Sequence, residues 1–203
     1  MSHKAIAHLT RTDKILGKLI ENVGPCGWKP HRQRSPFETL VNSVAHQQLN
    51  GTAARTILGR FRALYPGKRF PTPQDLIDTP DERLRSVGLS RAKVASIKDI
   101  AANTLSGIVP TSRAISRMEE ALILSRLTTI RGVGPWTVHM LMIFKLGRPD
   151  VLPITDYGVR KGFALTYRLK ELPTPNELLE HGEKWRPYRS FAAWYLWRAL
   201  DLP

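Results

Sequence analysis

The sequence contains a single cysteine, Cys26, in 203 residues. One cysteine rules out a disulfide within the chain and any zinc or iron–sulfur site built from four cysteine ligands. No apolar run approaches the roughly 20 residues that cross a bilayer, and the N-terminal stretch MSHKAIAHLTRTDK lacks the apolar core of a signal peptide. We therefore expect an intracellular protein with no iron–sulfur cluster and no membrane partner.

Strand patterns are missing too, because no segment shows sustained period-2 alternation and no Asn-Gly or Asp-Gly hairpin joins strand-like runs. Apolar residues recur instead at helical spacing, and capping residues precede several such segments. Asp13 can cap a first helix that ends near Gly24, and Ser35 with Glu38 forms a capping box before FETLVNSVAHQQ. The sequence predicts an all-α protein.

Acidic residues are scarce. The 17 Asp and Glu stand against 31 Lys and Arg, which leaves a formal net charge of +14. Such an excess favours a polyanion as partner, with nucleic acid ahead of an acidic membrane surface. Charge alone does not identify the function, because ribosomal and many other basic proteins share it.

The most informative stretch reads LTTIRGVGPWTVHMLMIFKLGRPDVLPITDY, from Leu127 to Tyr157. Its turn Gly132-Val133-Gly134 lies between segments with apolar residues at helical spacing, and Pro135 suits the first turn of the second helix. We expect a helix, a tight hairpin and a helix over about 118–146, with both glycines permitting positive φ. Such a hairpin can bind a phosphate, although many glycine-bearing turns serve only a steric purpose.

This stretch resembles the helix-hairpin-helix DNA glycosylase superfamily in its hairpin L-x-x-I-x-G-V-G-x-W-T, its apolar helix, its Pro-bearing loop over 147–157 and the aspartate that follows. The likeness is closest to the 3-methyladenine DNA glycosylase II branch and extends from about Phe37 to Trp197. It implies two helical subdomains flanking a DNA-binding cleft, within one compact unit over 1–203. Relatives usually carry a β-rich N-terminal region, which we do not expect here because only about 35 residues precede Phe37.

In the resembled family the aspartate that matches Asp156 is catalytic. A carboxylate there can stabilise an oxocarbenium-like deoxyribose and orient or deprotonate water. From the pattern alone Asp156 is an ordinary helix N-cap, and the two roles are compatible. Bifunctional relatives carry a lysine where this chain has Trp136, so we expect a monofunctional enzyme without lyase activity that requires no cofactor.

The base pocket is assigned by match to the family. Trp136, Tyr157 and Trp197 fall on pocket positions, with Tyr188 as a secondary candidate. Aromatic faces favour cationic, electron-poor bases through stacking and cation–π attraction. A purely structural role in the core is a serious alternative for Trp197, as it is for Trp194, because an aromatic stripe on a terminal helix usually belongs to the core.

The junction after the helix from Ser35 is assigned by the resemblance to the turn that enters the minor groove. Gln48 or Leu49 would fill the gap left by an extruded nucleotide, with Gln47 and Asn50 beside it. The alternative is a polar turn with ordinary capping.

At the hairpin, the resemblance implies two kinds of contact. The N–H groups around Gly132, Gly134 and Trp136 would clamp a DNA phosphate. The nearby cations are Arg131, Arg160 and Lys161. The carbonyls of Thr128, Ile130 and Gly132 can hold a Na⁺ or K⁺ ion, which would be structural and non-catalytic.

We therefore expect a monomeric DNA glycosylase that flips alkylated purines, of the 3-methyladenine or 7-methylguanine type, out of double-stranded DNA and hydrolyses the N-glycosidic bond. One alternative is a non-catalytic helix-hairpin-helix DNA-binding module, which leaves Asp156 without a purpose. Another is a glycosylase for deaminated or oxidised bases. The pocket residues do not rank these lesions.

Overall fold

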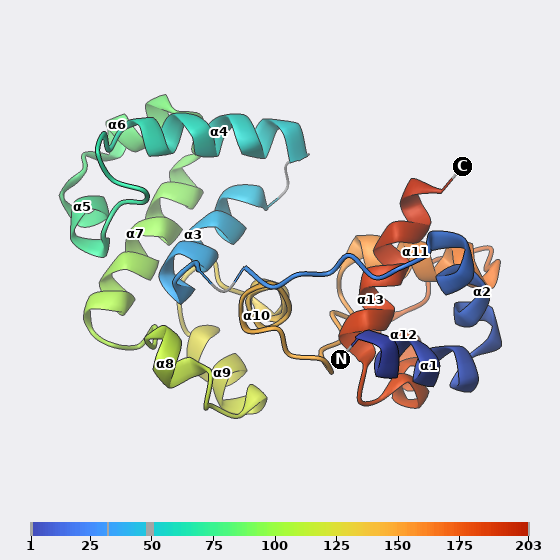
Figure 1. The fold of residues 1–203 in the computed structure, drawn as a ribbon. Coiled ribbons are helices and arrows are strands. Elements are labelled where there is room, and N and C mark those ends of the chain that lie inside the picture. The colour runs from blue at the N-terminus through green and yellow to red at the C-terminus, as the bar shows by residue number, and fades with distance from the viewer. Residues whose placement is uncertain (1, 32, 48–50, 203) are drawn as a thin grey trace. The chain divides into compact units, whose positions relative to one another are not determined.

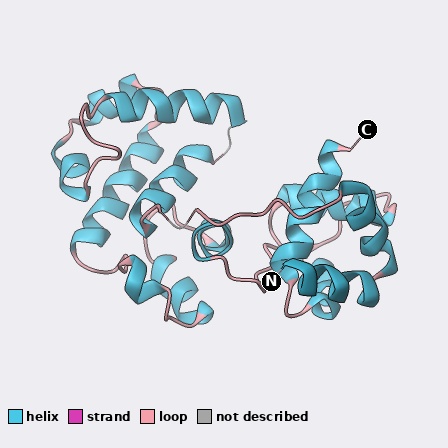
Figure 2. Ribbon diagram, in the orientation of Figure 1, coloured by secondary structure: helices cyan, strands magenta, loops and turns pink. Residues whose placement is uncertain are grey.

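A computed structural model describes residues 2–31, 33–47 and 51–202 (Figure 1). Within these ranges every regular element is a helix and there is no strand (Figure 2). The prediction of an all-α fold is confirmed. None of the described helices has both the length and the apolar character needed to cross a membrane.

The chain divides into two compact units. Unit 1 comprises Met1–Pro30 and Met142–Pro203, and unit 2 comprises His31–Leu141. The boundary between Leu141 and Met142 falls inside a continuous helical stretch, where α10 is followed directly by the π-helical turn η1.

Unit 2 is built around the long helix α7, which packs against α3, α5 and α6. Helix α3 also packs against α4 and α10. The helices of this unit are α3 (Pro36–His46), α4 (Gly51–Ala63), α5 (Pro73–Asp78), α6 (Asp81–Ser86), α7 (Arg91–Leu105), α8 (Ser112–Ile115), α9 (Glu120–Leu127) and α10 (Pro135–Leu141). The predicted helix–hairpin–helix therefore exists, as α9, a tight turn and α10 with η1.

The cap of α3 is only partly as predicted. The Ser35 hydroxyl accepts the N–H of Glu38 at 3.0 Å, and Pro36 occupies the first turn. The Glu38 carboxylate, expected to return to Ser35, pairs instead with Arg69 at 3.2 Å. A guanidinium attracts a carboxylate more strongly than a neutral backbone N–H does, so the ion pair replaces half of the capping box.

Unit 1 has a core of buried aromatic and aliphatic side chains, including Leu16, Phe163, Trp185 and Tyr195. Its helix α13 packs against α1, α2 and α11. The elements of this unit are α1 (Ser2–Thr12), α2 (Lys14–Val23), η1 (Met142–Leu146), α11 (Tyr157–Tyr167), α12 (Pro175–Gly182), η2 (Glu183–Trp185), α13 (Arg189–Arg198) and η3 (Ala199–Asp201). Helix α1 was not predicted from the sequence, whereas α2 and its end at Gly24 are confirmed.

Asp13 does more than cap α2. One carboxylate oxygen accepts the N–H of Leu16 at 3.1 Å. The other oxygen accepts hydrogen bonds from the Tyr167 hydroxyl and from Trp185 Nε1 at 3.0 Å. It also lies 3.2 Å from His181 Nε2. Burial acts to raise the pKa of Asp13, but the hydrogen bonds from His181, Tyr167, Trp185 and Leu16 outweigh it and hold the pKa well below the usual range. This buried carboxylate ties the α1–α2 turn to α11 and η2.

Candidate active site

Asp156 is the N-cap of α11, so the ordinary structural role expected of it is real. Its Oδ1 accepts the backbone N–H of Val159 at 2.7 Å. The same oxygen accepts the indole N–H of Trp197 at 2.8 Å. Only 9% of the surface of Asp156 is exposed. Cap and indole together fix the orientation of this buried carboxylate.

Trp197 comes from the last turn of α13 and is half-buried. Its indole stacks on the ring of Phe144, with centroids 5.5 Å apart and planes 29° from parallel. Part of the indole also packs against the unit 1 core, so the core alternative for Trp197 is partly right. The ring is nevertheless aimed at Asp156 through its N–H, and this places aromatic surface beside the carboxylate.

Phe144 was not predicted as a site residue. It belongs to η1, a π-helical turn, and such turns often occur at functional sites because they re-aim side chains. In the sequence Phe144 is one apolar residue in an apolar helix and cannot be distinguished from core.

Two glycines of α11 allow the approach of α13. A Cβ built at Gly158 would lie 2.9 Å from Trp197 Cδ1 and 3.1 Å from Asp156 Oδ1. A Cβ built at Gly162 would lie 1.9 Å from the carbonyl oxygen of Leu196. Residues four apart share one helix face, so the motif Gly-x-x-x-Gly is the sequence signal that could have indicated this contact.

The remaining predicted pocket aromatics lie in different surroundings. Tyr157 is 63% exposed, and the Lys161 ammonium lies 6.0 Å from its ring centroid. Tyr188 precedes α13, and its described ring contacts are with His8 and Phe191. Trp136 lies half-buried on α10 in unit 2. The structure thus brings Trp197 to Asp156, and the pocket roles of the other three stay predictions.

The hairpin in unit 2 needs only one of its two glycines for positive φ. Gly132 has φ +76°, and a Cβ built there would lie 2.2 Å from Ser96 Oγ on α7. Gly134 does not adopt positive φ. Its carbonyl accepts the N–H of Val138 and so begins the hydrogen bonding of α10. A Cβ built at Gly134 meets no atom within 4 Å, which leaves this side of the turn open.

The hairpin is fastened to the rest of unit 2 by polar side chains. Asp99 of α7 accepts the N–H of Arg131 at 2.8 Å. Gln47, which follows α3, donates to the Gly132 carbonyl at 3.0 Å and to the Thr137 hydroxyl at 3.1 Å. Gln47 was predicted to contact DNA, and this role stays a prediction; in the structure its amide nitrogen binds the hairpin.

Lys93 of α7 holds the segment that leads to the predicted minor-groove turn. Its ammonium donates to the carbonyls of Ala45 and Gln47 at 2.9 and 2.8 Å. Burial lowers the pKa of Lys93. The other residues predicted for this turn, Gln48, Leu49 and Asn50, lie outside the described residues.

The three predicted cations lie in different surroundings. Arg160 donates from Nε to the carbonyl of Pro173 at 2.7 Å, which ties α11 to the segment before α12. Lys161 and Arg131 are exposed. Of the carbonyls predicted to hold an ion, that of Ile130 accepts from Val133 and that of Gly132 from Gln47.

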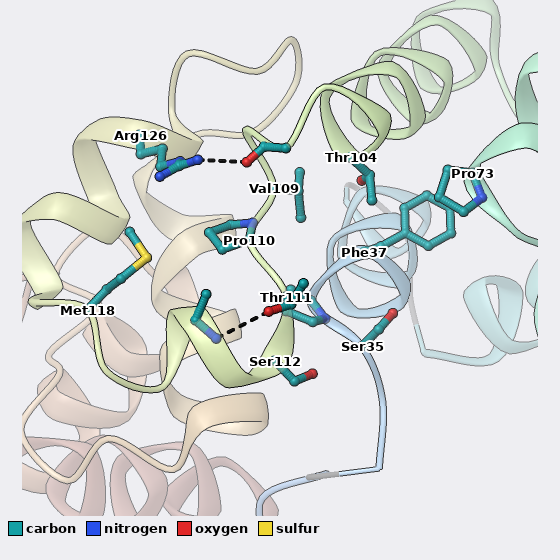
Figure 3. Close-up of a pocket in the computed structure, with 13 residues that line it drawn as sticks. Ser35, Phe37, Pro73, Thr104, Val109, Pro110, Thr111, Ser112, Met118 and Arg126 are labelled. Carbon is teal, nitrogen blue, oxygen red and sulfur yellow. Dashed lines mark hydrogen bonds between the residues drawn. The ribbon is translucent and has the colours of Figure 1, made fainter.

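An apolar hollow of about 590 Å³ lies elsewhere in unit 2, between α3, α8 and α9 (Figure 3). Phe37, Val109, Pro110 and Met118 contribute to its walls, and Arg126 borders it while donating to the carbonyl of Gly107. None of the predicted site residues that the structure describes lines this hollow.

Comparison with known proteins identifies a family whose match includes the hairpin and Asp156. Residues 41–187 match the HhH-GPD superfamily base excision DNA repair protein family. DNA-3-methyladenine glycosylase 1 of Schizosaccharomyces pombe is 40% identical over 202 residues, covering 98% of this chain and 88% of the relative.

Solved structures agree with this match. The structure of the Schizosaccharomyces pombe 3-methyladenine DNA glycosylase in complex with abasic DNA superposes with a TM-score of 0.92 at 40% identity, covering 98% of this chain and 97% of that one. A DNA-3-methyladenine glycosidase from Bacillus halodurans gives a TM-score of 0.83 at 33% identity, covering 96% and 88%. With its hairpin, its capped aspartate and most of its length matched, the chain belongs to the HhH-GPD superfamily of base excision DNA repair proteins.

Proposed function

We propose that this protein is a monofunctional DNA-3-methyladenine glycosylase that removes alkylated purines from double-stranded DNA. The observation that carries the proposal is the Asp156 carboxylate, held by Val159 and Trp197 beside the stacked rings of Trp197 and Phe144. The names of its relatives support the substrate class. A non-catalytic binding module would need Asp156 only as the N-cap of α11, a role that Ser, Thr or Asn also fills.

The chemistry follows from the charges involved. Hydrolysis breaks the bond between the sugar C1′ and the base nitrogen, whose electron pair leaves with the base, and water adds its oxygen to C1′. Positive charge that develops on the sugar is stabilised by the Asp156 carboxylate, which also orients the water and accepts its proton. An alkylated purine is already cationic, so its departure needs no strong general acid.

Recognition of the base is assigned to aromatic surface. A cationic ring that stacks against aromatic side chains gains on the order of 0.5 to 2 kcal/mol from cation–π attraction. Trp197 and Phe144 offer such surface next to the carboxylate, and the exposed ring of Tyr157 follows Asp156 directly in the chain. The base must first leave the duplex, and this step is cheaper for a damaged base than for a normal one.

DNA binding is assigned to the hairpin and to the net charge of +14. The N–H groups around Gly132, Gly134 and Trp136 would contact a phosphate, with the exposed Arg131 beside them. The open space around Gly134 suits close approach of a nucleic-acid backbone. We also propose a monomer that acts inside the cell, where its DNA is.

No cofactor is proposed for the reaction. A structural Na⁺ or K⁺ at the carbonyls of Thr128, Ile130 and Gly132 remains compatible with the hairpin, because a carbonyl that accepts one hydrogen bond keeps a second lone pair. Exchange of K⁺ for tetramethylammonium tests the ion. Weaker DNA binding at constant ionic strength, restored by K⁺, is the expected result, and an unchanged affinity would argue against it.

The decisive experiment is single-turnover base release from methylated duplex DNA, comparing the wild type with Asp156→Asn. Asparagine is also a good N-cap, so the variant removes the charge while preserving the start of α11. We expect free methylated purine from the wild type without strand nicking, and loss of release in Asp156→Asn with DNA binding retained.

Three results would change the assignment. No release by a folded, DNA-binding wild type would favour the binding module. Release from deaminated or oxidised duplexes alone would change the lesion class. Nicking without heat or alkali would show lyase activity and refute the inference drawn from Trp136.

A further inference from the structure

The loop that leads to Asp156 is attached to the start of α13 by a buried serine. Ser190 has no exposed surface. Its backbone N–H donates to the carbonyl of Pro149 at 2.9 Å, and its hydroxyl accepts the N–H of Val151 at 2.9 Å. The same hydroxyl lies 2.7 Å from the Arg148 carbonyl and 3.1 Å from that of Val151, and donates its single proton to one of them. Pro149 and Val151 are therefore held by one residue, and the Arg148 carbonyl lies within reach of the same hydroxyl.

The neighbouring residue strengthens the attachment. Arg189, 8% exposed, donates from Nε to Asp150 Oδ1 at 2.9 Å and from Nη2 to the Asp150 carbonyl at 2.9 Å. Its Nη1 reaches Glu183 at 3.1 Å. A buried ion pair is weak evidence for stability, because desolvation opposes the attraction. Its directed, multidentate bonds do define one position for the loop.

The other end of the same loop is attached to the other end of the same helix. Trp197 lies seven residues after Ser190, two helical turns and about 10 Å farther along α13, on the same face. Its indole N–H holds Asp156. In Figure 1, α13 is the red helix of unit 1. One rigid helix thus sets the distance between the start of the loop and its aspartate.

We propose that Ser190, supported by Arg189, is a positioning residue for Asp156. The inference rests on the proposed function and deepens it: Ser190 fixes the loop from 148 to 151 so that the carboxylate arrives at Trp197 in the geometry needed for base release. Misplacement of a reacting group by about 1 Å can cost on the order of 100-fold in rate. Removal of the Ser190 hydroxyl should therefore lower the rate of the chemical step while substrate binding is preserved.

The test compares Ser190→Ala with a matched control, Thr79→Val. Thr79 in unit 2 is 8% exposed, and its hydroxyl contacts the Asp75 carbonyl at 2.6 Å and the Tyr65 hydroxyl at 2.8 Å. Each substitution removes one buried hydroxyl, but only Ser190 touches the loop. Two quantities are measured on methylated duplex DNA under single-turnover conditions: the rate at saturating enzyme and the enzyme concentration that gives half of that rate.

A third readout needs no activity. The indole N–H resonance of Trp197 in a ¹H–¹⁵N spectrum reports its hydrogen bond to Asp156, and a Trp197→Phe spectrum identifies it among the five tryptophans. We expect Ser190→Ala to move this resonance and to lower the saturating rate by about 10-fold or more, with the half-saturating concentration within about twofold of wild type. Thr79→Val should change none of the three.

The outcomes separate the two proposals. A folded Ser190→Ala with wild-type rate and resonance overturns the positioning role, as does an equal loss in Thr79→Val. Should Ser190→Ala fail to fold, Arg189→Lys replaces it as the test. Lysine keeps the charge but cannot reach Asp150 and Glu183 together. A shifted Trp197 resonance with a reduced rate in this variant supports the positioning of Asp156 by this attachment. If the wild type releases no base, the proposed function fails, and the resonance alone decides whether Ser190 positions the pair.

Discussion

Gly158 offers the sharpest test of the contact between α11 and α13. In Gly158→Ala the new Cβ would lie 2.9 Å from Trp197 Cδ1 and 3.1 Å from both Trp197 Nε1 and Asp156 Oδ1. Ordinary contacts begin near 3.4 Å, so the indole must move away by roughly 0.5 Å and the carboxylate by roughly 0.3 Å. Both partners of the proposed site are displaced by one methyl group.

The expected magnitude follows from the bond that is strained. The Trp197 to Asp156 hydrogen bond is 2.8 Å long and involves a carboxylate. A hydrogen bond to a charged group contributes about 1.5 to 3 kcal/mol, and each 1.36 kcal/mol corresponds to a tenfold change in rate. Loss of most of this bond should slow base release by about 10- to 100-fold.

The assay is single-turnover base release, with Gly59→Ala as the control. Gly59 lies inside α4, and a Cβ built there meets nothing within 4 Å. Alanine in a helix interior stabilises by about 0.5 to 1 kcal/mol relative to glycine, so Gly59→Ala should raise the melting temperature and leave the rate unchanged. Gly158→Ala should bind DNA normally and react slowly. A Gly158→Ala enzyme with the wild-type rate would refute the reasoning.

Three further outcomes follow from single contacts. Hydrogen bonds hold the pKa of Asp13 low against the effect of burial. The ionised carboxylate therefore stabilises the fold fully above the pKa of about 3.9 that it has in the unfolded chain, and this stabilisation is lost progressively as pH falls below that value. In urea unfolding, the free energy of unfolding of Asp13→Asn should fall less between pH 6 and pH 3 than that of the wild type. Lys93→Met removes the donor to Gln47, and fluorescence anisotropy should show weaker DNA binding. Gly162→Ala drives a Cβ against the Leu196 carbonyl, and thermal unfolding should show destabilisation by about 1 to 3 kcal/mol or more.

Much of the fold could be predicted because local signals agreed with one another. The hairpin over 118–146 was marked by glycine, proline and apolar spacing, and the structure has α9, the turn and α10 with η1 there. Helix α1 was missed for a physical reason. Only Ala5 and Leu9 of α1 are buried, and two small contacts give too little periodicity to distinguish a helix from a polar terminus.

The site was harder to predict because its contacts join distant parts of the chain. Asp156 and Trp197 were named through the family resemblance, but the hydrogen bond between them spans 41 residues. Phe144 and Ser190 have no local signature, since an apolar residue in a helix and a serine near a helix start are both commonplace. The sequence also could not say which hairpin glycine would use its freedom, because a glycine permits positive φ without requiring it, and only Gly132 of the two adopts it.

Polar and apolar contacts of α13 have different consequences for the proposed reaction. Its buried side chains Tyr195 and Leu196 belong to the unit 1 core, and burial of such side chains stabilises by about 1.5 to 3 kcal/mol each. Apolar packing is non-directional, so it would tolerate small shifts of the loop along the helix. Hydrogen bonds are directional, and those of Ser190 and Trp197 fix the position of the loop relative to α13 at each of its ends. Stability and base release are therefore expected to respond to different residues of the same helix.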